Sequence, residues 1–445
     1  MSGSKVGFNS FNCRPHQAAK LPQGATHGKR TTRHRHLHQE LPNELHRSCE
    51  IGTLRSMLLP DEVLTQLRRR WPEWQSHEDG RRAELRIYGE AWERLTREKG
   101  QSIREWAERS GGRIAWPIES WEGWTDRGLD FAHHEAARAW AGTQLGGKVT
   151  LAVDGSQIPP LAEIGLPIAA LQVALFENPH TAAGQFRRTL TFELLSPEEL
   201  PAEISGEPGE LRPSIDQWIN LRRFELEVST LAQRLHELSA PSAGSLHAVA
   251  FFDSPLSASF AERQPDALRQ RYERAMELLL KASRQSGIPV IGYIDISRAR
   301  DLVRLLESYF GLPPATRITD AELLQSAGRL GWGARLPLLN VSSSKREELG
   351  FVYLQTTGTG PPARLEIPRW VGDAGFVDEL IAIVLAEVIV GNGFPYPIES
   401  ADAAAALTAR DRDRFVALVQ QVATAHGSPL TVSSTAKARS KARRR

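Results

Sequence analysis

Cysteine is almost missing from this chain. Its 445 residues include only Cys13 and Cys49, which excludes a disulfide scaffold and a zinc site built on paired CxxC motifs. Long apolar runs are missing too. The most apolar stretch, 380–390, is interrupted by Glu387 and is far shorter than the roughly 20 residues of a helical membrane span. The N-terminus lacks the apolar core of a secretory signal, so we expect a cytoplasmic protein without a membrane segment.

Several catalytic signatures are also absent. The chain has no GxxxxGK[ST] phosphate loop and no GxSxG nucleophile elbow. The glycines around Gly358 are too short a motif for a dinucleotide fingerprint, and His134-Glu135 lacks the second histidine of an HExxH zinc motif. ATPase, dehydrogenase, zinc protease and α/β-hydrolase chemistry therefore lose their usual sequence evidence.

Positive charge is concentrated at the two ends of the chain. The formal net charge is +2, but residues 1–50 contribute +5 and residues 437–445 contribute +6, which leaves −9 on residues 51–436. Basic ends can bind nucleic-acid phosphates, or they can simply remain solvated. An acidic body is not typical of a protein that coats DNA, and it suits an enzyme whose carboxylates hold divalent cations.

Changes in composition predict four segments. Residues 1–50 are rich in Pro, Gly, His and Arg and lack periodicity, which predicts a disordered, basic and His-rich arm. Residues 51–145 carry apolar residues at helical spacing and predict a helical extension. Residues 146–426 are predicted to form one α/β domain, and residues 427–445 a disordered basic tail.

The helical extension is rich in tryptophan although it lies outside the predicted α/β domain. Aromatic residues are enriched at protein interfaces, so we expect this segment to make contacts with a partner protein or within a dimer. The residues that motivate this expectation are Trp71, Trp74, Trp92 and Trp106.

The pattern within 146–426 predicts a mixed sheet. Strand-like runs at 149–153, 164–176 and 186–195 have short connections, which is typical of an antiparallel meander. A strong helix at 214–239 is followed by strands at 247–252 and 288–294 with a helix between them, which predicts parallel pairing. We therefore predict an α/β fold in which an antiparallel meander continues into parallel strands flanked by helices.

Acidic residues stand at the ends of two predicted strands. Asp154 follows the first strand, Asp253 follows the strand after the long helix, and Glu225 and Glu227 lie on that helix. The carboxyl ends of strands are where open α/β sheets bind ligands, so two aspartates on neighbouring strands would lie close together and a helical glutamate could join them. Each residue alone is equally typical of a turn or a surface position.

Such a cluster predicts a divalent metal. Neighbouring carboxylates in water-poor surroundings raise one another's pKa, and a cation removes this conflict. Mg²⁺ and Mn²⁺ prefer oxygen ligands, and two ions about 3.5–4 Å apart can clamp the attacking and leaving oxygens of a phosphodiester. On a helical wheel, Glu227 lies somewhat closer to the apolar stripe than Glu225 does, so the preference for Glu227 is slight.

Six short motifs, in this order, resemble the NurA nuclease family. The resemblance covers about residues 148–425, and its specificity comes from the order of the set, since no single motif is specific. The motifs are Leu-Ala-Val-Asp154-Gly-Ser, Arg223-x-x-x-Glu227, Ala-Phe-Phe-Asp253-Ser-Pro-Leu, Gly292-Tyr-Ile-Asp-Ile-Ser-Arg298, Arg364-Leu-Glu-Ile-Pro-Arg-Trp370 and Phe394-Pro-Tyr-Pro-Ile-Glu-Ser-Ala-Asp402.

This resemblance implies an RNase H-like fold, with which the predicted β-β-β-α-β order agrees. It implies a DNA nuclease with two Mn²⁺ (or Mg²⁺) ions, acting as a 5′–3′ exonuclease, an endonuclease or both. It further implies a homodimer that acts with a hexameric HerA-type ATPase in DNA end resection during double-strand break repair. Asp154, Glu227 and Asp253 would be the catalytic metal ligands, with Glu225 as the alternate helical ligand.

One position departs from the family pattern. Asp402 stands where the family often has a histidine; an aspartate can bind a metal but cannot donate a proton at neutral pH. Asp402 and Asp295 are therefore alternative candidates for a fourth ligand. Arg298 and Arg300 could contact phosphate, and a solvated start of a helix is an equally good interpretation of them. Tyr396, with Trp370, could stack on a base, although core or rim packing is more typical of these side chains.

Two other functions remain open at the level of the sequence. The first is a catalytically weak or inactive NurA-like adaptor that binds DNA and a motor ATPase, which Asp402 and the acidic body favour. The second is a nuclease that acts on RNA or hybrids, because contacts to the 2′-hydroxyl, and not the carboxylates, distinguish RNA from DNA.

Overall fold

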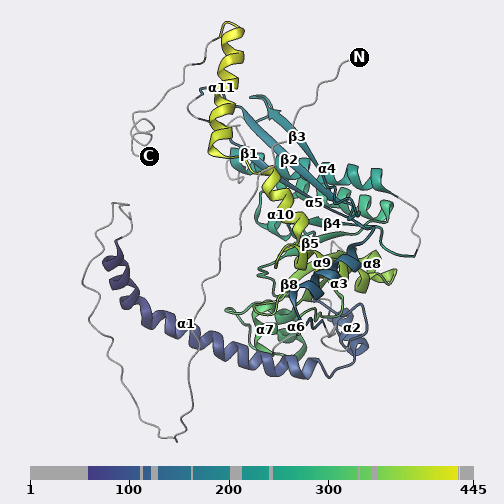
Figure 1. Ribbon diagram of the computed structural model, residues 1–445. Coiled ribbons are helices and arrows are strands. Elements are labelled where there is room, and N and C mark those ends of the chain that lie inside the picture. Colours follow the sequence, from purple (N-terminus) through teal and green to yellow (C-terminus); the bar gives the residue numbers. More distant parts are fainter. Residues whose placement is uncertain are drawn as a thin grey trace, which may run out of the picture. The chain divides into compact units, whose positions relative to one another are not determined.

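The structure is a computed structural model of residues 1–445 (Figure 1). It describes residues 59–110, 114–121, 129–161, 164–200, 213–239, 244–328, 331–341, 348–428 and 430. The predicted arm at 1–50 lies outside these residues, as does nearly all of the predicted tail at 427–445. The chain divides into two compact units, Met1–Gln66 and Leu67–Arg445. In the first unit the described residues are 59–66, where helix α1 (Pro60–Leu95) begins.

The second unit is built on one sheet of eight strands in the order β3-β2-β1-β4-β5-β8-β7-β6. Strand β4 pairs in parallel with β1 and with β5, and the other pairs are antiparallel. The strands are β1 (Val149–Ile158), β2 (Ala169–Asn178), β3 (Arg187–Leu195), β4 (Ala248–Phe252), β5 (Val290–Ile294), β6 (Leu339–Asn340), β7 (Leu349–Leu354) and β8 (Ala363–Pro368).

This topology confirms the predicted fold class. The first three strands form an antiparallel meander, and the chain then crosses through a helix to β4 and β5, which continue the sheet in parallel from β1. The order β3-β2-β1-β4-β5 is that of an RNase H-like core. Strands β8, β7 and β6 extend this core with antiparallel pairs.

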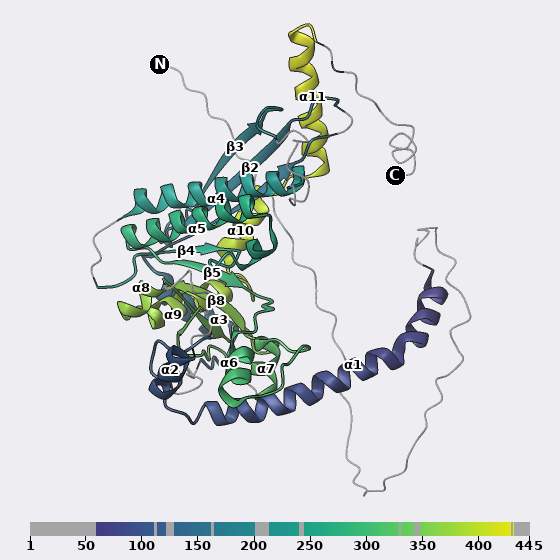
Figure 2. The same cartoon turned by 180° about the vertical axis from the view of Figure 1, so that it is seen from behind.

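Helices cover both faces of the sheet (Figures 1 and 2). Successive residues of a strand point to opposite faces, so Leu151 and Val153 of β1 pack with α4 and α5, and Ala152 packs with α9 and α3. The helices of the second unit are the rest of α1, then α2 (Gly100–Arg109), α3 (His134–Leu145), α4 (Ile215–Leu238), η1 (Ser259–Arg263), α5 (Asp266–Ser286), α6 (Asp301–Phe310), α7 (Asp320–Ser326), α8 (Arg369–Asp373), α9 (Val377–Val390), α10 (Tyr396–Ala405) and α11 (Ala409–Ala425).

Helix α9 contains the apolar stretch in which the sequence has Glu387. This side chain is fully buried and accepts a hydrogen bond from Thr150 Oγ1 at 2.6 Å, so α9 is an interior helix of the protein. Among the described residues, no helix is both long and apolar enough to cross a membrane.

The sequence of residues 402–425 predicts a single helix, but the structure has two helices there. Helix α10 ends at Ala405 and α11 begins at Ala409. The break has a local cause, because Thr408 forms a capping box with Asp411 and so starts a new helix. As a result, Asp402 lies in the last turns of α10, a helix that packs on β1 and β2.

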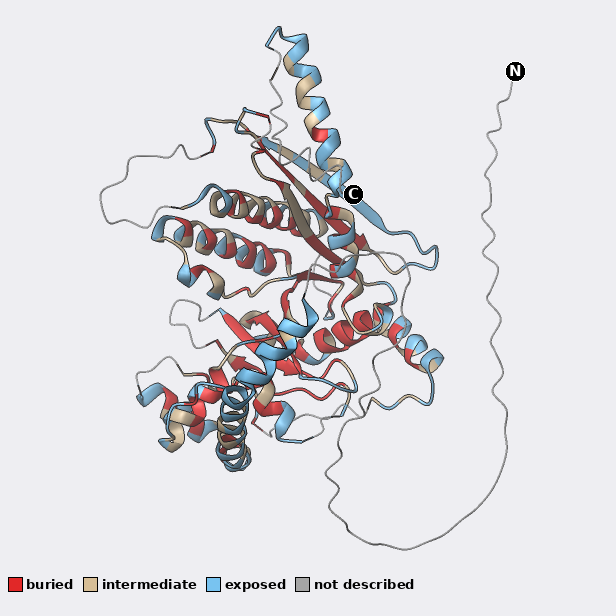
Figure 3. Ribbon diagram, turned by 90° about the vertical axis from the view of Figure 1, so that its left-hand side faces the viewer, coloured by how far each residue is buried: buried red, intermediate tan, exposed pale blue. Residues whose placement is uncertain are grey.

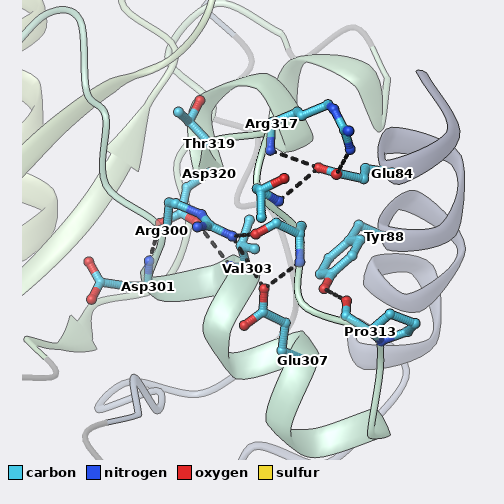
Figure 4. A network of polar contacts seen from close by, with 12 residues as sticks. Glu84, Tyr88, Arg300, Asp301, Val303, Glu307, Pro313, Arg317, Thr319 and Asp320 are labelled. Atoms are coloured by element: carbon cyan, nitrogen blue, oxygen red, sulfur yellow. Dashed lines mark hydrogen bonds and ion pairs between the residues drawn. The ribbon is translucent and has the colours of Figure 1, made fainter. Parts of the chain in front are cut away.

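The C-terminal half of α1 is fixed to the segment between α6 and α7 (Figure 4). Tyr88 donates a hydrogen bond to the carbonyl oxygen of Pro313 at 2.7 Å, and Glu84 accepts one from Arg317 Nη1 at 2.8 Å. Trp92 is buried beside Trp121.

The four tryptophans within residues 53–108 therefore differ in their surroundings. Trp92 is 3% exposed and belongs to the main core, and Trp106 packs edge-on against Tyr309. Trp71 and Trp74 are 56% and 42% exposed, on the part of α1 that Figure 3 colours as exposed. Of the four, this second pair has a surface available for a partner.

Candidate functional site

Asp154 and Asp253 lie at the same level on neighbouring parallel strands. The pairing of β1 with β4 sets Val153 opposite Phe252, so the two aspartates follow this pair side by side. Strands in a sheet are about 4.8 Å apart, which brings the two carboxylates close together. The prediction that Asp154 ends its strand was wrong: β1 continues to Ile158, because its antiparallel pairing with β2 goes on after β4 has ended.

Gly155 allows helix α4 to approach β1 closely beside Asp154. A Cβ atom at Gly155 would lie 2.5 Å from Glu227 Oε1 and 2.9 Å from Arg223 Cγ. Any larger residue there would have to displace these side chains. Glu227 is only 6% exposed, so its carboxylate is held in the interface between α4 and the sheet.

Arg223 brings a positive charge into this group of acids. Its Nη1 donates hydrogen bonds to Glu227 Oε1 at 2.5 Å and to the carbonyl oxygen of Gly155 at 3.0 Å. Its Nε donates to Gln157 Oε1 at 3.0 Å. The guanidinium therefore connects α4 with two positions of β1, while its side chain remains 28% exposed.

Two carboxyl groups of the cluster bind protons more tightly than usual. Burial raises the pKa of Asp154 to about 6; the positive charge of Arg223 opposes this rise and the negative charge of Asp402 adds to it. Burial also raises the pKa of Glu227 to about 7, again against Arg223 and with a contribution from Asp154. The contribution from Asp154 is a direct sign that the two side chains are near one another.

Asp253 and Asp402 complete the group. The pKa of Asp253 is raised by loss of hydration, then by the charges of Asp402 and Asp295, even though Asp253 and Asp402 both remain exposed at the edge of the cluster. Asp402 reaches the site from α10 and interacts with Asp154 as well. We call Asp154, Glu227, Asp253 and Asp402 the carboxylate cluster; Asp295 lies next to it, on the loop after β5.

The donor chemistry of this cluster fits a hard divalent cation. All its donors are carboxylate oxygens, three of its four acids have raised pKa values, and a guanidinium already supplies part of the missing positive charge. Within the described residues, however, no group of three or more His, Cys, Asp or Glu side chains is already arranged to hold an ion. Binding an ion would therefore require side-chain rearrangement in the cluster.

Glu225, the alternate helical ligand, lies on another side of α4. Arg271 donates two hydrogen bonds to its carboxylate, at 2.7 and 2.6 Å, and Arg222 pairs with it at 3.3 Å. These residues line a surface cavity of about 420 Å³. The structure thus separates the two glutamates that helix phase alone distinguishes poorly.

The candidate nucleic-acid contacts also differ from one another. Arg300 donates to Glu307 and to the carbonyl oxygen of Ala315, so it is engaged in holding α6. Tyr396 packs edge-on against Phe176 at 5.7 Å. Arg298 is exposed on the loop that carries Asp295. Its side chain is therefore accessible to a phosphate group.

Sequence reasoning misses the central place of Arg223 and Gln157. The sequence signals for Arg223 are its place in the Arg223-x-x-x-Glu227 motif and its position four residues before Glu227, a spacing that puts two side chains on one helix face; neither predicts its contacts with β1. Gln157 has no signal, because the predicted strand ends before it. Its place follows from the extension of β1 to Ile158.

The protein is therefore an α/β domain with a sheet of RNase H-like order, and its carboxylates lie where the parallel strands β1 and β4 end side by side. The chain belongs to the NurA family: the model of the NurA domain matches residues 148–407, which include every member of the carboxylate cluster. Membership of this family supports a nuclease-type function.

Among solved structures, the chain is similar to the crystal structure of NurA with manganese, with 11% identity and a TM-score of 0.31 over 63% of this chain and 90% of that one. It is also similar to the catalytic domain of human Endonuclease V, with 13% identity and a TM-score of 0.29 over 68% and 92%. For Argonaute of Kluyveromyces polysporus with a guide RNA, the identity is 14% and the TM-score 0.25 over 60% and 27%. No curated protein matches the chain.

Proposed function

We propose that this protein is a divalent-metal-dependent DNA nuclease that hydrolyses phosphodiester bonds at the carboxylate cluster. The observation that carries the proposal is the convergence of four acids from β1, α4, the end of β4 and α10. Family membership supports the nuclease class. The metal is supported by the donor chemistry of the cluster, in which every donor is a carboxylate oxygen.

In this proposal Asp154, Glu227 and Asp253 hold the metal, and Asp402 is the additional ligand. Mn²⁺ or Mg²⁺, two ions in all, would supply an activated water and charge stabilisation for the leaving oxygen. The side chains position the metal. Asp154 and Asp253 approach it from the adjacent strands β1 and β4, and Glu227 approaches it from helix α4. Asp402 cannot donate a proton when ionised, so the leaving oxygen takes its proton from solvent.

The wider role follows from the family resemblance. We propose that the protein resects DNA ends in double-strand break repair as a homodimer together with a HerA-type hexameric ATPase. It would act as a 5′–3′ exonuclease, an endonuclease or both. Arg298, which is exposed on the loop that carries Asp295, is the side chain we propose for a phosphate contact.

The test is a cleavage assay on end-labelled single- and double-stranded DNA with Mn²⁺, Mg²⁺ or EDTA. We expect metal-dependent cleavage that falls at least about 100-fold in Asp154→Asn and Asp253→Asn, because each loses a charged ligand. Glu225→Gln is the control. It removes a carboxylate from α4, the helix that carries Glu227, at a position outside the carboxylate cluster. Equal loss in the control, or cleavage that survives EDTA, would contradict the assignment.

The second candidate function is an adaptor that binds DNA and the ATPase without turnover. The observation that favours it is Asp402, which stands where the family often has histidine. It predicts that the wild type and Asp154→Asn are equally inactive with Mn²⁺ and the ATPase present, while both still bind DNA. Labelled RNA and RNA–DNA hybrids in the same assay decide the substrate class.

A further inference from the structure

We propose that Arg223 is a built-in counter-cation that competes with the divalent metal for Glu227 and so lowers the metal affinity of the site. This inference rests on the proposed function. It concerns a residue that the carboxylate assignment leaves without a role.

The first step is the position of the guanidinium. Its Nη1 bonds to Glu227 Oε1, an oxygen that a bound ion would need, and its charge also acts on Asp154. Arg223 thus faces both buried acids of the cluster, as a metal ion would. A Cβ at Gly155 would touch both Glu227 and Arg223, so the two side chains are held together in a narrow space.

The second step is that Glu227 cannot easily serve both cations. Its carboxylate is nearly buried, and one of its oxygens is already occupied by Arg223. Two positive groups at a few ångströms repel each other strongly where water is scarce. A metal that uses the occupied oxygen must displace the guanidinium, and one that uses the other oxygen must bind a few ångströms from its positive charge. The Arg223 side chain is 28% exposed and so has a route outward.

The third step is that Arg223 could instead support metal binding through the same contacts. The direction in which the metal affinity changes when Arg223 is removed therefore distinguishes the two roles. If Arg223 only positions Glu227 for the metal, its removal weakens metal binding. If Arg223 competes with the metal, its removal strengthens binding, because the acids lose their internal counter-charge.

The experiment compares Mn²⁺ affinity, measured by the loss of the free-ion electron paramagnetic resonance signal, in the wild type and three variants of the full chain. We expect Arg223→Gln to bind Mn²⁺ on the order of tenfold more tightly at pH 8, from the loss of one nearby charge. Arg223→Lys keeps the charge and should stay within about threefold of the wild type. The Mn²⁺ concentration for half-maximal cleavage should shift in the same direction.

Arg222→Gln is the matched control. Arg222 precedes Arg223 on α4 and has a similarly exposed side chain, at 33%, but it pairs with Glu193 and Glu225 outside the cluster. It should leave the Mn²⁺ affinity unchanged. Thermal unfolding of each variant shows that the fold is kept.

The outcomes separate the two proposals. Weaker or unchanged Mn²⁺ binding in Arg223→Gln, with binding by the wild type intact, would overturn the competition and leave the nuclease proposal standing. Absence of Mn²⁺ binding by every variant would overturn both, because no metal would then use the cluster. Binding by Arg223→Gln that is at least several-fold tighter than that of the wild type and of Arg222→Gln supports the competition.

Discussion

At the residue scale, Gly155 controls how closely Glu227 can lie to Asp154. In Gly155→Ala the new Cβ would meet Glu227 Oε1 at 2.5 Å, and both the glutamate and Arg223 would have to move. We expect cleavage to fall at least about tenfold, and the free energy of unfolding to fall by about 1–3 kcal/mol, the usual cost of overpacking. Denaturant unfolding and the cleavage assay measure the two effects.

The control for this prediction is another glycine of the same unit. A Cβ at Gly142, within helix α3, meets nothing within 4 Å. Gly142→Ala should therefore raise stability by about 0.5–1 kcal/mol through helix propensity and leave cleavage unchanged. If Gly155→Ala behaves like Gly142→Ala, then the close approach of α4 to β1 is not needed for the site.

The raised pKa values of Asp154 and Glu227 predict that metal binding is coupled to proton release. In the folded protein without metal these groups have pKa values of about 6 and about 7, above their ordinary values of 3.8 and 4.5. Between the ordinary and the raised values the folded chain holds more protons than the unfolded chain. Raising the pH through this window therefore lowers the contribution of these groups to stability.

A metal binds the ionised carboxylates, so it must expel these protons. We expect Mn²⁺ affinity to rise from about pH 5 to about 7.5 and then level off, with more protons released near pH 6 than near pH 8. Titration calorimetry in buffers of different ionisation enthalpy counts the protons. The double variant Asp154→Asn/Glu227→Gln should release fewer protons per bound ion, because only Asp253 keeps a raised pKa, and proton release independent of pH would contradict the raised values.

At the scale of elements, strand β8 anchors the loop that carries Asp253. The buried carboxylate of Glu366 accepts hydrogen bonds from Ser257 N at 2.7 Å and from Ser257 Oγ at 3.2 Å. Arg364, two residues earlier, bonds to Glu366 and lies over the ring of Phe351 at 3.9 Å. The loop passes close over β5, where a Cβ at Gly292 would lie 2.7 Å from the carbonyl oxygen of Ser254.

This anchoring predicts that Glu366→Gln weakens metal binding although Glu366 lies outside the carboxylate cluster. The amide loses one acceptor for Ser257 and leaves the buried Arg364 with less counter-charge. Arg364 keeps its ion pair with Asp301 at 2.8 Å, so we expect a loss of about 1–3 kcal/mol. Mn²⁺ affinity should fall several-fold as the loop with Asp253 loosens. Ser257→Ala is the milder comparison, at about 1 kcal/mol. If Glu366→Gln lowers stability but leaves the Mn²⁺ affinity unchanged, then this hydrogen-bond network stabilises the sheet and does not position Asp253.

The elements also show what sequence can and cannot predict here. Alternation and helical spacing predicted the meander, the crossover and the parallel strands, because β1, β2, β4, β5 and α4 bury apolar side chains at regular spacing. Strand β3 is mostly exposed and was predictable from its short connection to β2. They missed the extension of β1 to Ile158 and the break before Thr408, because the first depends on a partner strand and the second on a local cap. Helix phase could not separate Glu227 from Glu225, because the two lie at similar angular distances from the apolar stripe. Only the placement of β1 against α4 shows which of them faces the site.

The carboxylates were the predictable part of the site, since strand ends meet at one edge of a sheet. The counter-charge was less predictable. Arg223 becomes meaningful only through contacts with Gly155 and Gln157, which belong to the strand opposite its helix. The parts of the site that could not be predicted from the sequence are those that depend on contacts between distant segments.

At the scale of the whole molecule, exposed tryptophans mark the surface that we propose for partner or dimer contacts. Trp71 and Trp74 lie one turn apart on α1 with their ring centres 6.1 Å apart, and both are exposed. Leu67 is exposed four residues before Trp71, so the apolar side chains recur at helical spacing on one stripe. The buried residues Tyr88 and Trp92 lie further along the same helix.

We therefore expect Trp71→Ser/Trp74→Ser to keep the fold and to lose association. Exposed side chains contribute little to stability, so the free energy of unfolding should change by less than about 0.5 kcal/mol, whereas Trp92→Ala should lose about 3–5 kcal/mol. Light scattering measures the mass of each variant, and co-purification with a HerA-type ATPase measures partner binding. A double variant with unchanged mass and unchanged ATPase binding would remove this stripe from the proposed interfaces, while metal-dependent cleavage in the same sample would show that the catalytic proposal stands without it.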